Sequence, residues 1–208
     1  MHVEILHTAD ASSHKQQLLN ELYRLRAKVF AQRLGWDVEV KNGEETDEYD
    51  LLQPTYLAVL DDWRVVGGAR LLPATGPTMV THTFAFLLEE GRGLGDPITT
   101  IESSRFCIDT DAAAEVAGTG LHQATHTLFA ALLEWSIQKG FSTIATVTDV
   151  RFERLLRRTG WPLARLGAPR RVGDTIAVAG LLPANLESLE RVKLRTYRPI
   201  FPQLCAVP

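Results

Sequence analysis

The segment from Ile101 to Asp109 carries side chains that can do acid–base chemistry within what reads as a buried strand. Glu102, Ser104 and Arg105 stand among apolar neighbours there, and a buried charge without a partner costs several kcal/mol. Regular alternation predicts two faces: Glu102, Ser104 and Phe106 on one, Ser103, Arg105 and Cys107 on the other. A carboxylate and a hydroxyl on one face suit holding and deprotonating a polar substrate, and the alternative is a structural ion pair.

Two segments of opposite charge suggest two different partners. Residues 37–50 hold seven acidic side chains against one lysine, and residues 151–171 hold seven arginines against one glutamate. Such patches attract a cationic and an anionic partner, unless they are solvated faces or pair with each other. Because residues 37–50 are hydrophilic and poor in core residues, we expect a flexible acidic loop that handles substrate.

The bulk composition excludes several classes of protein. The 208 residues fit one domain, 1–208, and a net charge of −3 argues against a nucleic-acid partner. The two cysteines, Cys107 and Cys205, form no disulfide framework. We find no secretion signal and no apolar run long enough for a bilayer, so we expect a cytoplasmic protein without membrane insertion.

Hydrophobic periodicity predicts helices interspersed with strands, which is typical of an α/β protein with a layered sheet. The predicted strands are 3–6, 56–60, 65–72, 100–108, 143–148 and 175–180, and the predicted helices are 16–33, 83–88, 122–139, 150–158 and 186–192. Strands 100–108 and 143–148 flank a helix in a βαβ unit, so they should be parallel. Gly118 and Gly120 before that helix suggest an ordinary turn or, alternatively, backbone amides that approach a phosphate.

Several motifs occur in an order that resembles one known family. They are Leu25–Phe30, Leu34–Val38, Glu45–Asp50, Gly68–Pro73, Thr75–Pro77, Glu102–Phe106, Glu134–Ser136, Thr146–Asp149 and Arg158–Trp161. They cover most of the chain and make it similar to the N-acyl-L-homoserine-lactone synthases, the quorum-sensing autoinducer synthase family. The resemblance implies a three-layer α/β/α sandwich with a central mixed sheet, as in the N-acetyltransferases.

The resemblance also implies an acyltransferase reaction with two substrates. The amine of S-adenosylmethionine is acylated from the thioester of an acyl carrier protein, or of acyl-CoA in some members. The product closes to a homoserine lactone and releases methylthioadenosine. S-adenosylmethionine is thus a co-substrate, and neither a further cofactor nor a metal is implied.

The family's charged and aromatic positions predict a site for S-adenosylmethionine. We expect it to comprise Arg26, Phe30, Trp36, Asp47, Asp50, Arg70 and Phe106. Arg26 would meet the substrate carboxylate, while the acids and the rings attract the sulfonium. Two alternatives remain open: the charged residues form a network that orders the loop on substrate arrival, and the rings are ordinary packing residues.

Glu102, Ser104 and Arg105 form the predicted catalytic set. Glu102 is the general-base candidate, directly or through one water, because partial burial raises a carboxylate pKa. Ser104 orients substrate rather than attacks it, since no Ser-His-acid set is legible in the sequence. Backbone amides near Arg105 and Phe106 are candidates for stabilising the thioester oxyanion.

The acyl donor accounts for the basic segment. Acyl carrier proteins are acidic, and we expect them to dock on Arg151, Arg154 and Arg158 of one helix. The predicted acyl pocket comprises Met79, Phe84, Leu128, Trp135 and Thr148, with Leu88 and Phe106 as further candidates, and each is alternatively a core residue. The Thr148 hydroxyl would bond the oxygen of a 3-oxo acyl group.

Two rival functions stay open at this point. The first is an acyl-CoA-dependent N-acyltransferase of the same fold that acts on another small amine. That group usually has Gln or Arg at the start of its phosphate-binding turn, where this chain has Glu115. The second is a non-catalytic module that binds acyl ligands or carrier protein, which would not need residues 37–50 together with Glu102.

Overall fold

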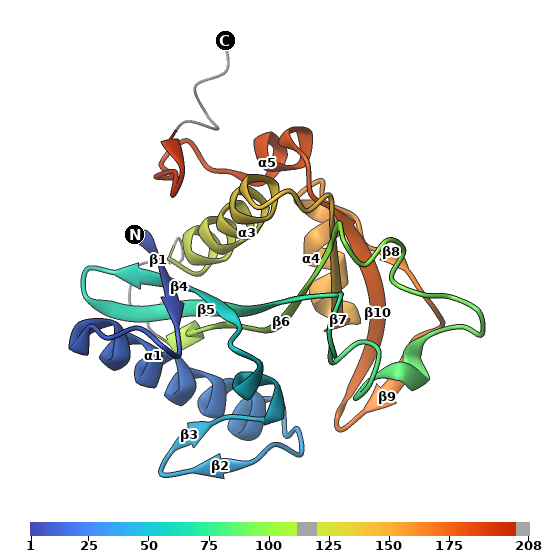
Figure 1. Cartoon of the computed structure of the whole chain (residues 1–208), viewed down its shortest axis with the longest axis horizontal. Helices are drawn as coiled ribbons and strands as arrows, with labels where there is room; N and C mark the ends of the chain where they lie inside the picture. Colours follow the sequence, from blue (N-terminus) through green and yellow to red (C-terminus); the bar gives the residue numbers. More distant parts are fainter. Residues whose placement is uncertain (112–119, 203–208) are drawn as a thin grey trace.

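A mixed β-sheet forms the centre of the molecule (Figure 1). The computed structural model describes residues 1–111 and 120–202. The strands of the sheet are β1 (His2–His7), β4 (Thr55–Asp61), β5 (Arg64–Pro73), β6 (Thr100–Ile108), β7 (Thr143–Asp149), β8 (Ala164–Arg165), β9 (Arg170–Val172) and β10 (Thr175–Pro183). They run in the order β1, β4, β5, β6, β7, β10 and β8, with β9 also paired to β10.

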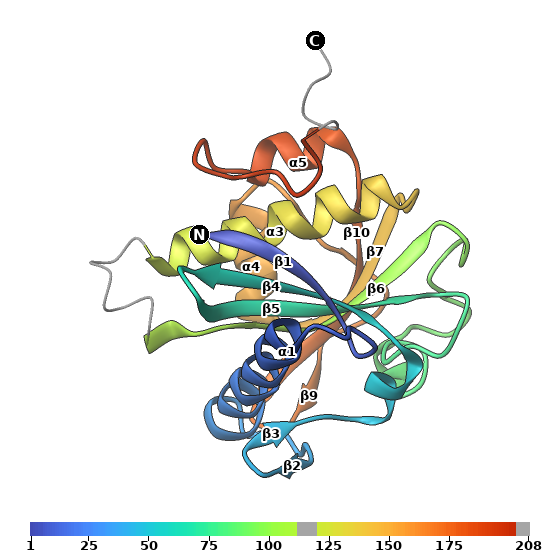
Figure 2. The same cartoon turned by 60° about the vertical axis from the view of Figure 1, so that its left-hand side comes forward.

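Helices cover both faces of this sheet, so the predicted three-layer arrangement is confirmed (Figures 1 and 2). One face carries α1 (Ser13–Arg26) and its π-helical continuation η1 (Ala27–Arg33), and the other carries α3 (Gly120–Gln138), α4 (Val150–Arg158) and α5 (Leu186–Val192). Gly68 on β5 lets α1 lie close to the sheet, because a Cβ there would come within 2.5 Å of the Leu22 Cδ1.

The parallel pair β6 and β7 confirms the predicted βαβ unit. These strands pair only at Thr100–Thr143, Ile101–Ile144 and Glu102–Ala145. Beyond Glu102 they run in different directions, as Figure 1 shows. The sheet therefore opens in the middle of β6, beside the predicted catalytic residues.

Most predicted elements are found, and β6, α4 and α5 agree with the prediction at both ends. The predicted helix 83–88 is reduced to a single 3-10 turn, η3 (Ala85–Leu87). Strands β8 and β9 were not predicted, because a strand of two or three residues is too short to show a hydrophobic period. Glu115 and Gly118 lie outside the described residues. None of the helices in residues 1–111 and 120–202 combines the length and the apolar character that a bilayer crossing requires.

Residues 37–50 are not the core-poor loop that the composition predicted. They contain the hairpin of β2 (Val40–Lys41) and β3 (Glu44–Glu45) and lead into the 3-10 helix η2 (Glu48–Leu52). Glu45, Tyr49 and Asp50 are all buried. Two of these buried residues are acids, so their partners decide how the segment folds.

Candidate active site

A β-bulge at Arg105 corrects the predicted faces of β6. Arg105 has a φ of 55°, and the pairing register with β5 shifts between Ser104 and Cys107. The extra residue resets the alternation, so Arg105 joins Glu102 and Ser104 on the α1 face while Phe106 packs on the α3 face. The predicted placement of Phe106 beside Glu102, with Arg105 opposite, was wrong because alternation does not foresee an inserted residue.

A buried ion network begins on the α1 face at Arg26. Its Nε donates to the Glu45 Oε2 at 2.5 Å, and its two terminal nitrogens donate to the two oxygens of Asp50 at 2.9 Å. The Tyr56 hydroxyl donates to the Asp50 Oδ1 at 2.6 Å. Burial alone would raise the pKa of Asp50, but the contact with Arg26 and the charge of Arg70 hold that pKa well below its usual range.

Two further arginines extend this network into the sheet. Arg70 on β5 donates to both oxygens of Asp47 and to the Asp50 Oδ1 at 2.8 Å. The Arg105 Nη2 lies 2.8 Å from the Glu45 Oε1 and 2.9 Å from the Asp47 Oδ2. Three guanidiniums therefore neutralise three carboxylates, and none of the six side chains is more than 12% exposed.

The network revises the roles expected of four predicted substrate residues. Arg26, Asp47, Asp50 and Arg70 bond one another and do not line the main cavity. All three guanidinium nitrogens of Arg26 are engaged, so its predicted contact with a substrate carboxylate is not supported. These four residues form the charge network that was the alternative to direct substrate contact. Sequence reasoning missed Glu45, although it balances the third arginine.

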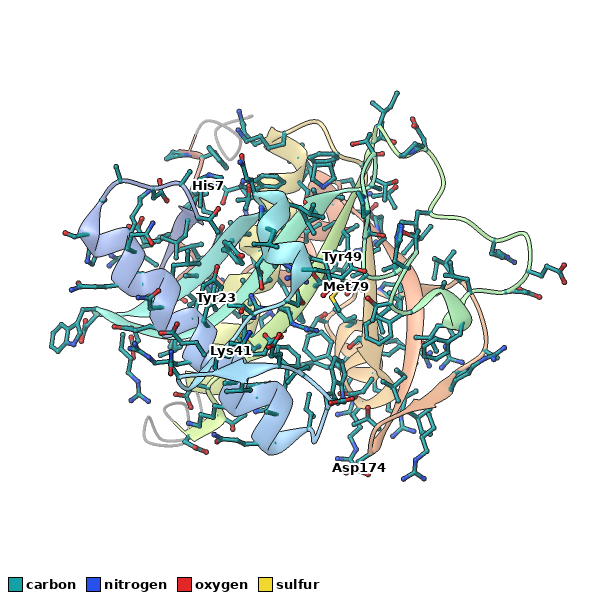
Figure 3. All side chains as sticks on the ribbon, turned by 60° about the horizontal axis from the view of Figure 1, so that its bottom comes forward. His7, Tyr23, Lys41, Tyr49, Met79 and Asp174 are labelled. Atoms are coloured by element: carbon teal, nitrogen blue, oxygen red, sulfur yellow. The ribbon has the colours of Figure 1, made fainter. Side chains whose placement is uncertain are left out.

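One cavity of about 660 Å³ passes through the gap between β6 and β7. Its α1-side half is lined by Phe30, Leu34, Trp36, Met79, Phe84, Ser104 and Arg105. Its α3-side half is lined by Phe106, Phe129, Leu132, Thr148, Phe152, Leu156 and Trp161. Met79 lies beside Tyr49 in the middle of the molecule (Figure 3). A ligand on each face of the sheet can therefore meet the other inside a single space.

Glu102 lines this cavity where β6 and β7 begin to diverge. Its side chain is fully buried, and its Oε2 accepts the N–H of Val80 at 2.7 Å. Its Oε1 has no hydrogen-bond partner in the described part of the chain. Burial raises the pKa of Glu102, although the amides of Val80 and Met79 oppose the rise. A carboxylate with a raised pKa and one oxygen that accepts no hydrogen bond has the properties of a general base.

Aromatic rings dominate the α1-side half. The ring centroids of Phe30 and Trp36 lie 5.3 Å apart, and those of Trp36 and Phe84 lie 6.2 Å apart. The indole Nε1 of Trp36 is buried and has no partner among the described residues. Met79 and Phe84, which we expected in the acyl pocket, belong to this half with Phe30 and Trp36.

The α3-side half is apolar and was only partly predicted. Phe106 lies here, with its ring centroid 5.4 Å from that of Phe129 and 4.7 Å from that of Phe152. Phe106, which we expected in the S-adenosylmethionine site, therefore lines the cavity from the α3 face. Thr148 on β7 also lines this half.

Three predicted acyl-pocket residues lie elsewhere. Leu128 is fully buried in the core, Trp135 stacks on Phe141 with centroids 5.9 Å apart, and Leu88 packs on another cluster. None of them lines the main cavity. Helical spacing identified α3 residues that are buried, but it does not show which of them border an opening.

The predicted docking arginines lie on α4. Arg151, Arg154 and Arg158 are exposed, and Arg151 also lines the main cavity. The single acid of this helix, Glu153, is held by Arg165 through two bonds of 2.7 Å. Glu153 is therefore neutralised, and the exposed side of α4 is cationic.

Comparisons with known proteins identify the family of this chain. The model of the autoinducer synthase family matches residues 10–192. An acyl-homoserine-lactone synthase of Rhizobium radiobacter is 50% identical over 92% of this chain and 90% of its own length. One from Pseudomonas aeruginosa is 35% identical over 83% of this chain and 86% of its own.

Solved structures show the same architecture. The AHL synthase LasI superposes with a TM-score of 0.80 at 33% identity, over 94% of this chain and 98% of LasI. The CoA-dependent acyl-homoserine lactone synthase BjaI, solved with SAM and isopentyl-CoA, gives a TM-score of 0.77 at 25% identity, over 91% and 87%. An acyl-CoA N-acyltransferase from Pseudomonas aeruginosa shares the fold at a TM-score of 0.56 and 16% identity, over 87% and 99%. This chain belongs to the autoinducer synthase family: it is an acyl-homoserine-lactone synthase, an acyltransferase that produces a quorum-sensing signal.

Proposed function

We propose that S-adenosylmethionine binds in the α1-side half of the cavity and the acyl thioester in the α3-side half. The observation that carries this proposal is the continuity of the cavity through the β6–β7 gap, with the unpartnered oxygen of Glu102 in its wall. The two halves differ in chemistry, since one combines rings with polar groups and the other is apolar. The BjaI structure, which holds SAM and isopentyl-CoA, supports a family site with room for both substrates.

In the α1-side half, the aromatic rings receive the sulfonium and the adenosine. Phe30, Trp36 and Phe84 offer ring faces for cation–π contact and stacking. The guanidinium of Arg105, bonded to Glu45 and Asp47, lies 5.2 Å from the Phe30 centroid. The ion network thus fixes residues 37–50 against η1 and holds the rings in place. Residues 37–50 are then the substrate-binding segment of a single synthase domain, 1–208.

Acylation requires a neutral amine, and Glu102 takes the proton. The amine nitrogen then forms the amide bond, the carbonyl carbon–sulfur bond breaks, and the departing thiolate takes up a proton. The bulge removes Arg105 and Phe106 from regular pairing with β5, and we assign their backbone amides to the thioester oxyanion. Ser104, whose hydroxyl accepts from the Arg70 Nε at 3.2 Å, orients the amine.

Lactone closure needs positioning rather than a protein nucleophile. A carboxylate oxygen of the acylated product attacks the carbon next to the sulfonium, and the carbon–sulfur bond breaks. The negative carboxylate and the positive sulfonium disappear together, so neutral methylthioadenosine leaves. Rings that hold the sulfonium beside this carbon supply the effective concentration that the closure requires.

The acyl donor approaches from α4. We assign Arg151, Arg154 and Arg158 to docking of an acidic acyl carrier protein, because their exposed guanidiniums have no acidic competitor once Glu153 is paired. The acyl chain lies among the rings of the α3-side half, where the Thr148 hydroxyl meets a 3-oxo group. Acyl-CoA is the alternative donor.

We assign the enzyme to the cytoplasm, because S-adenosylmethionine and acyl carrier protein are made there. The free thiol of Cys107 fits a reducing compartment. Burial raises the pKa of Cys107 to about 12, so the thiol stays protonated and unreactive at neutral pH.

The experiment is a reconstituted reaction with purified protein, S-adenosylmethionine and a series of acyl carrier protein and acyl-CoA thioesters. Release of methylthioadenosine together with an acyl-homoserine lactone, seen by mass spectrometry, is the expected result. Thiol release without methylthioadenosine would instead mark an N-acyltransferase for another amine. A stable complex with no turnover of any donor would contradict the catalytic assignment.

A further inference from the structure

Arg33 is a cation of the main cavity that the reaction described above does not use. Three arginines line this cavity: Arg33, Arg105 and Arg151. Arg105 is neutralised by Glu45 and Asp47, and Arg151 belongs to the docking face of α4. Within residues 1–111 and 120–202, Arg33 makes no ion pair. An exposed guanidinium is therefore available to an anion at the edge of the cavity.

Two neutral acceptors hold Arg33 at the end of β6. Its Nη1 donates to the Ile108 carbonyl at 3.4 Å and to the Thr110 Oγ1 at 3.2 Å. Both bonds are long, and they use one of the three guanidinium nitrogens. Arg33 is thus placed by the strand end, and most of its donors have no partner among the described residues, which leaves them for a ligand.

The distance from the reacting centre decides which anion this is. The position of Arg33 is three to five residues beyond Arg105, or about 10–17 Å at the rise of a β-strand. The carboxylate of S-adenosylmethionine is two bonds from its amine, so it cannot reach Arg33 while the amine lies at Glu102. The acyl donor carries a second anion, the phosphate at the end of its phosphopantetheine arm. Its thioester sulfur and its phosphorus are about thirteen bonds apart, or roughly 15 Å at the pitch of an extended chain.

We propose that Arg33 binds this phosphate and so sets the depth to which the thioester enters the cavity. The inference rests on the proposed function, because it takes the thioester to lie beside Glu102 and the β6 bulge. A guanidinium suits the task, since its planar donors match phosphate oxygens in pairs. Carrier protein carries this phosphate as a phosphodiester and CoA carries it as part of a pyrophosphate, so Arg33 serves either donor.

The test compares two inert thioethers, S-octyl-phosphopantetheine and S-octyl-pantetheine, which differ by the phosphate. Their inhibition constants are measured against the wild-type enzyme, Arg33→Gln and the control Arg191→Gln, an exposed arginine of α5 that does not line the cavity. We expect the wild-type enzyme and the control to prefer the phosphorylated compound. In Arg33→Gln, the ratio of the two inhibition constants should be about tenfold smaller. The inhibition constant of S-octyl-pantetheine should be the same for all three proteins.

Three results would overturn the proposal. The first is a wild-type enzyme that does not prefer the phosphorylated thioether. The second is an Arg33→Gln variant that keeps the full preference, and the third is an Arg33→Gln variant that binds both thioethers more weakly by the same factor. Substrate kinetics separate the sources, since Arg33→Gln should raise the KM for acyl carrier protein and for acyl-CoA alike. An effect on carrier protein alone would make Arg33 a protein-docking residue instead. Methylthioadenosine release by the wild-type enzyme tests the proposed function independently.

Discussion

Replacing Glu102 with glutamine removes one proton acceptor and almost nothing else. The new side chain has the same shape, and its carbonyl oxygen can still accept the Val80 N–H that the Glu102 Oε2 now accepts at 2.7 Å. The Glu102 Oε1, which has no hydrogen-bond partner in the described structure, is replaced by an amide nitrogen that cannot take up a proton. The amine of S-adenosylmethionine then loses its proton to water alone. Positioned general bases contribute about 10²–10⁴-fold to rate, so we expect Glu102→Gln to lower kcat by at least about 100-fold.

The raised pKa of Glu102 adds two signed expectations. The wild-type kcat should fall as the pH is lowered through this pKa, which lies above the ordinary value of 4.5. Glu102→Gln should lack that acidic limb. Because burial raises the pKa of Glu102 in the folded state, its ionisation opposes folding once the pH exceeds the unfolded-state pKa. Glutamine removes that cost, so at pH 8 the Tm of the variant should equal or exceed that of the wild type.

The assay is methylthioadenosine release at saturating substrates across pH 5–9, with melting curves of the same samples. Glu102→Asp serves as the matched control, since it keeps the carboxylate on a side chain that is one methylene group shorter. A variant Glu102→Gln that retains near-normal kcat, or that loses activity only by unfolding, would refute the general-base assignment. A wild-type acidic limb that persists in Glu102→Gln would assign that titration to another group.

Further predictions concern stability, donor docking and acyl selectivity. Asp50→Asn leaves two buried guanidiniums without full compensation and should lower the free energy of unfolding in urea by about 3 kcal/mol, whereas exposed Asp37→Asn should change it little; equal stability of the two variants would contradict the network. Reversing the charges of Arg154 and Arg158 should raise the KM for acyl carrier protein about tenfold, less for acyl-CoA, with the difference shrinking in high salt. An unchanged KM would move the docking surface off α4. Thr148→Val should lower the ratio of 3-oxo to unsubstituted products about fivefold in mass spectra, and a constant ratio would remove Thr148 from acyl recognition.

Local patterning made the architecture predictable. In β6 an apolar strand is interrupted by polar residues, and in α4 apolar and cationic residues alternate at helical spacing. Both elements were placed to the residue, because each pattern is complete within its own segment. The parallel pairing of β6 and β7 followed from the βαβ rule, which needs only the order of elements, whereas the mixed sheet was implied by the family resemblance.

The interior of the site was less predictable because it depends on contacts between distant segments. The bulge at Arg105 is specified by its neighbours in the fold, so alternation gave the wrong face for Phe106. Composition marked residues 37–50 as solvated, although Glu45 and Asp50 are buried by arginines from three other elements. The motifs did identify Asp50 as a functional position, but they could not distinguish residues that bond one another from residues that touch a ligand.

The bulge in β6 also has a consequence for how signals diversify. It turns successive side chains of one strand toward two compartments, one bounded by fixed charges and rings and the other by interchangeable apolar walls such as Phe129, Leu132 and Leu156. Substitutions in the second compartment leave the salt-bridged one untouched. Such enzymes can therefore evolve signals with different acyl chains through substitution of a few hydrophobic residues, while every signal keeps the same lactone ring.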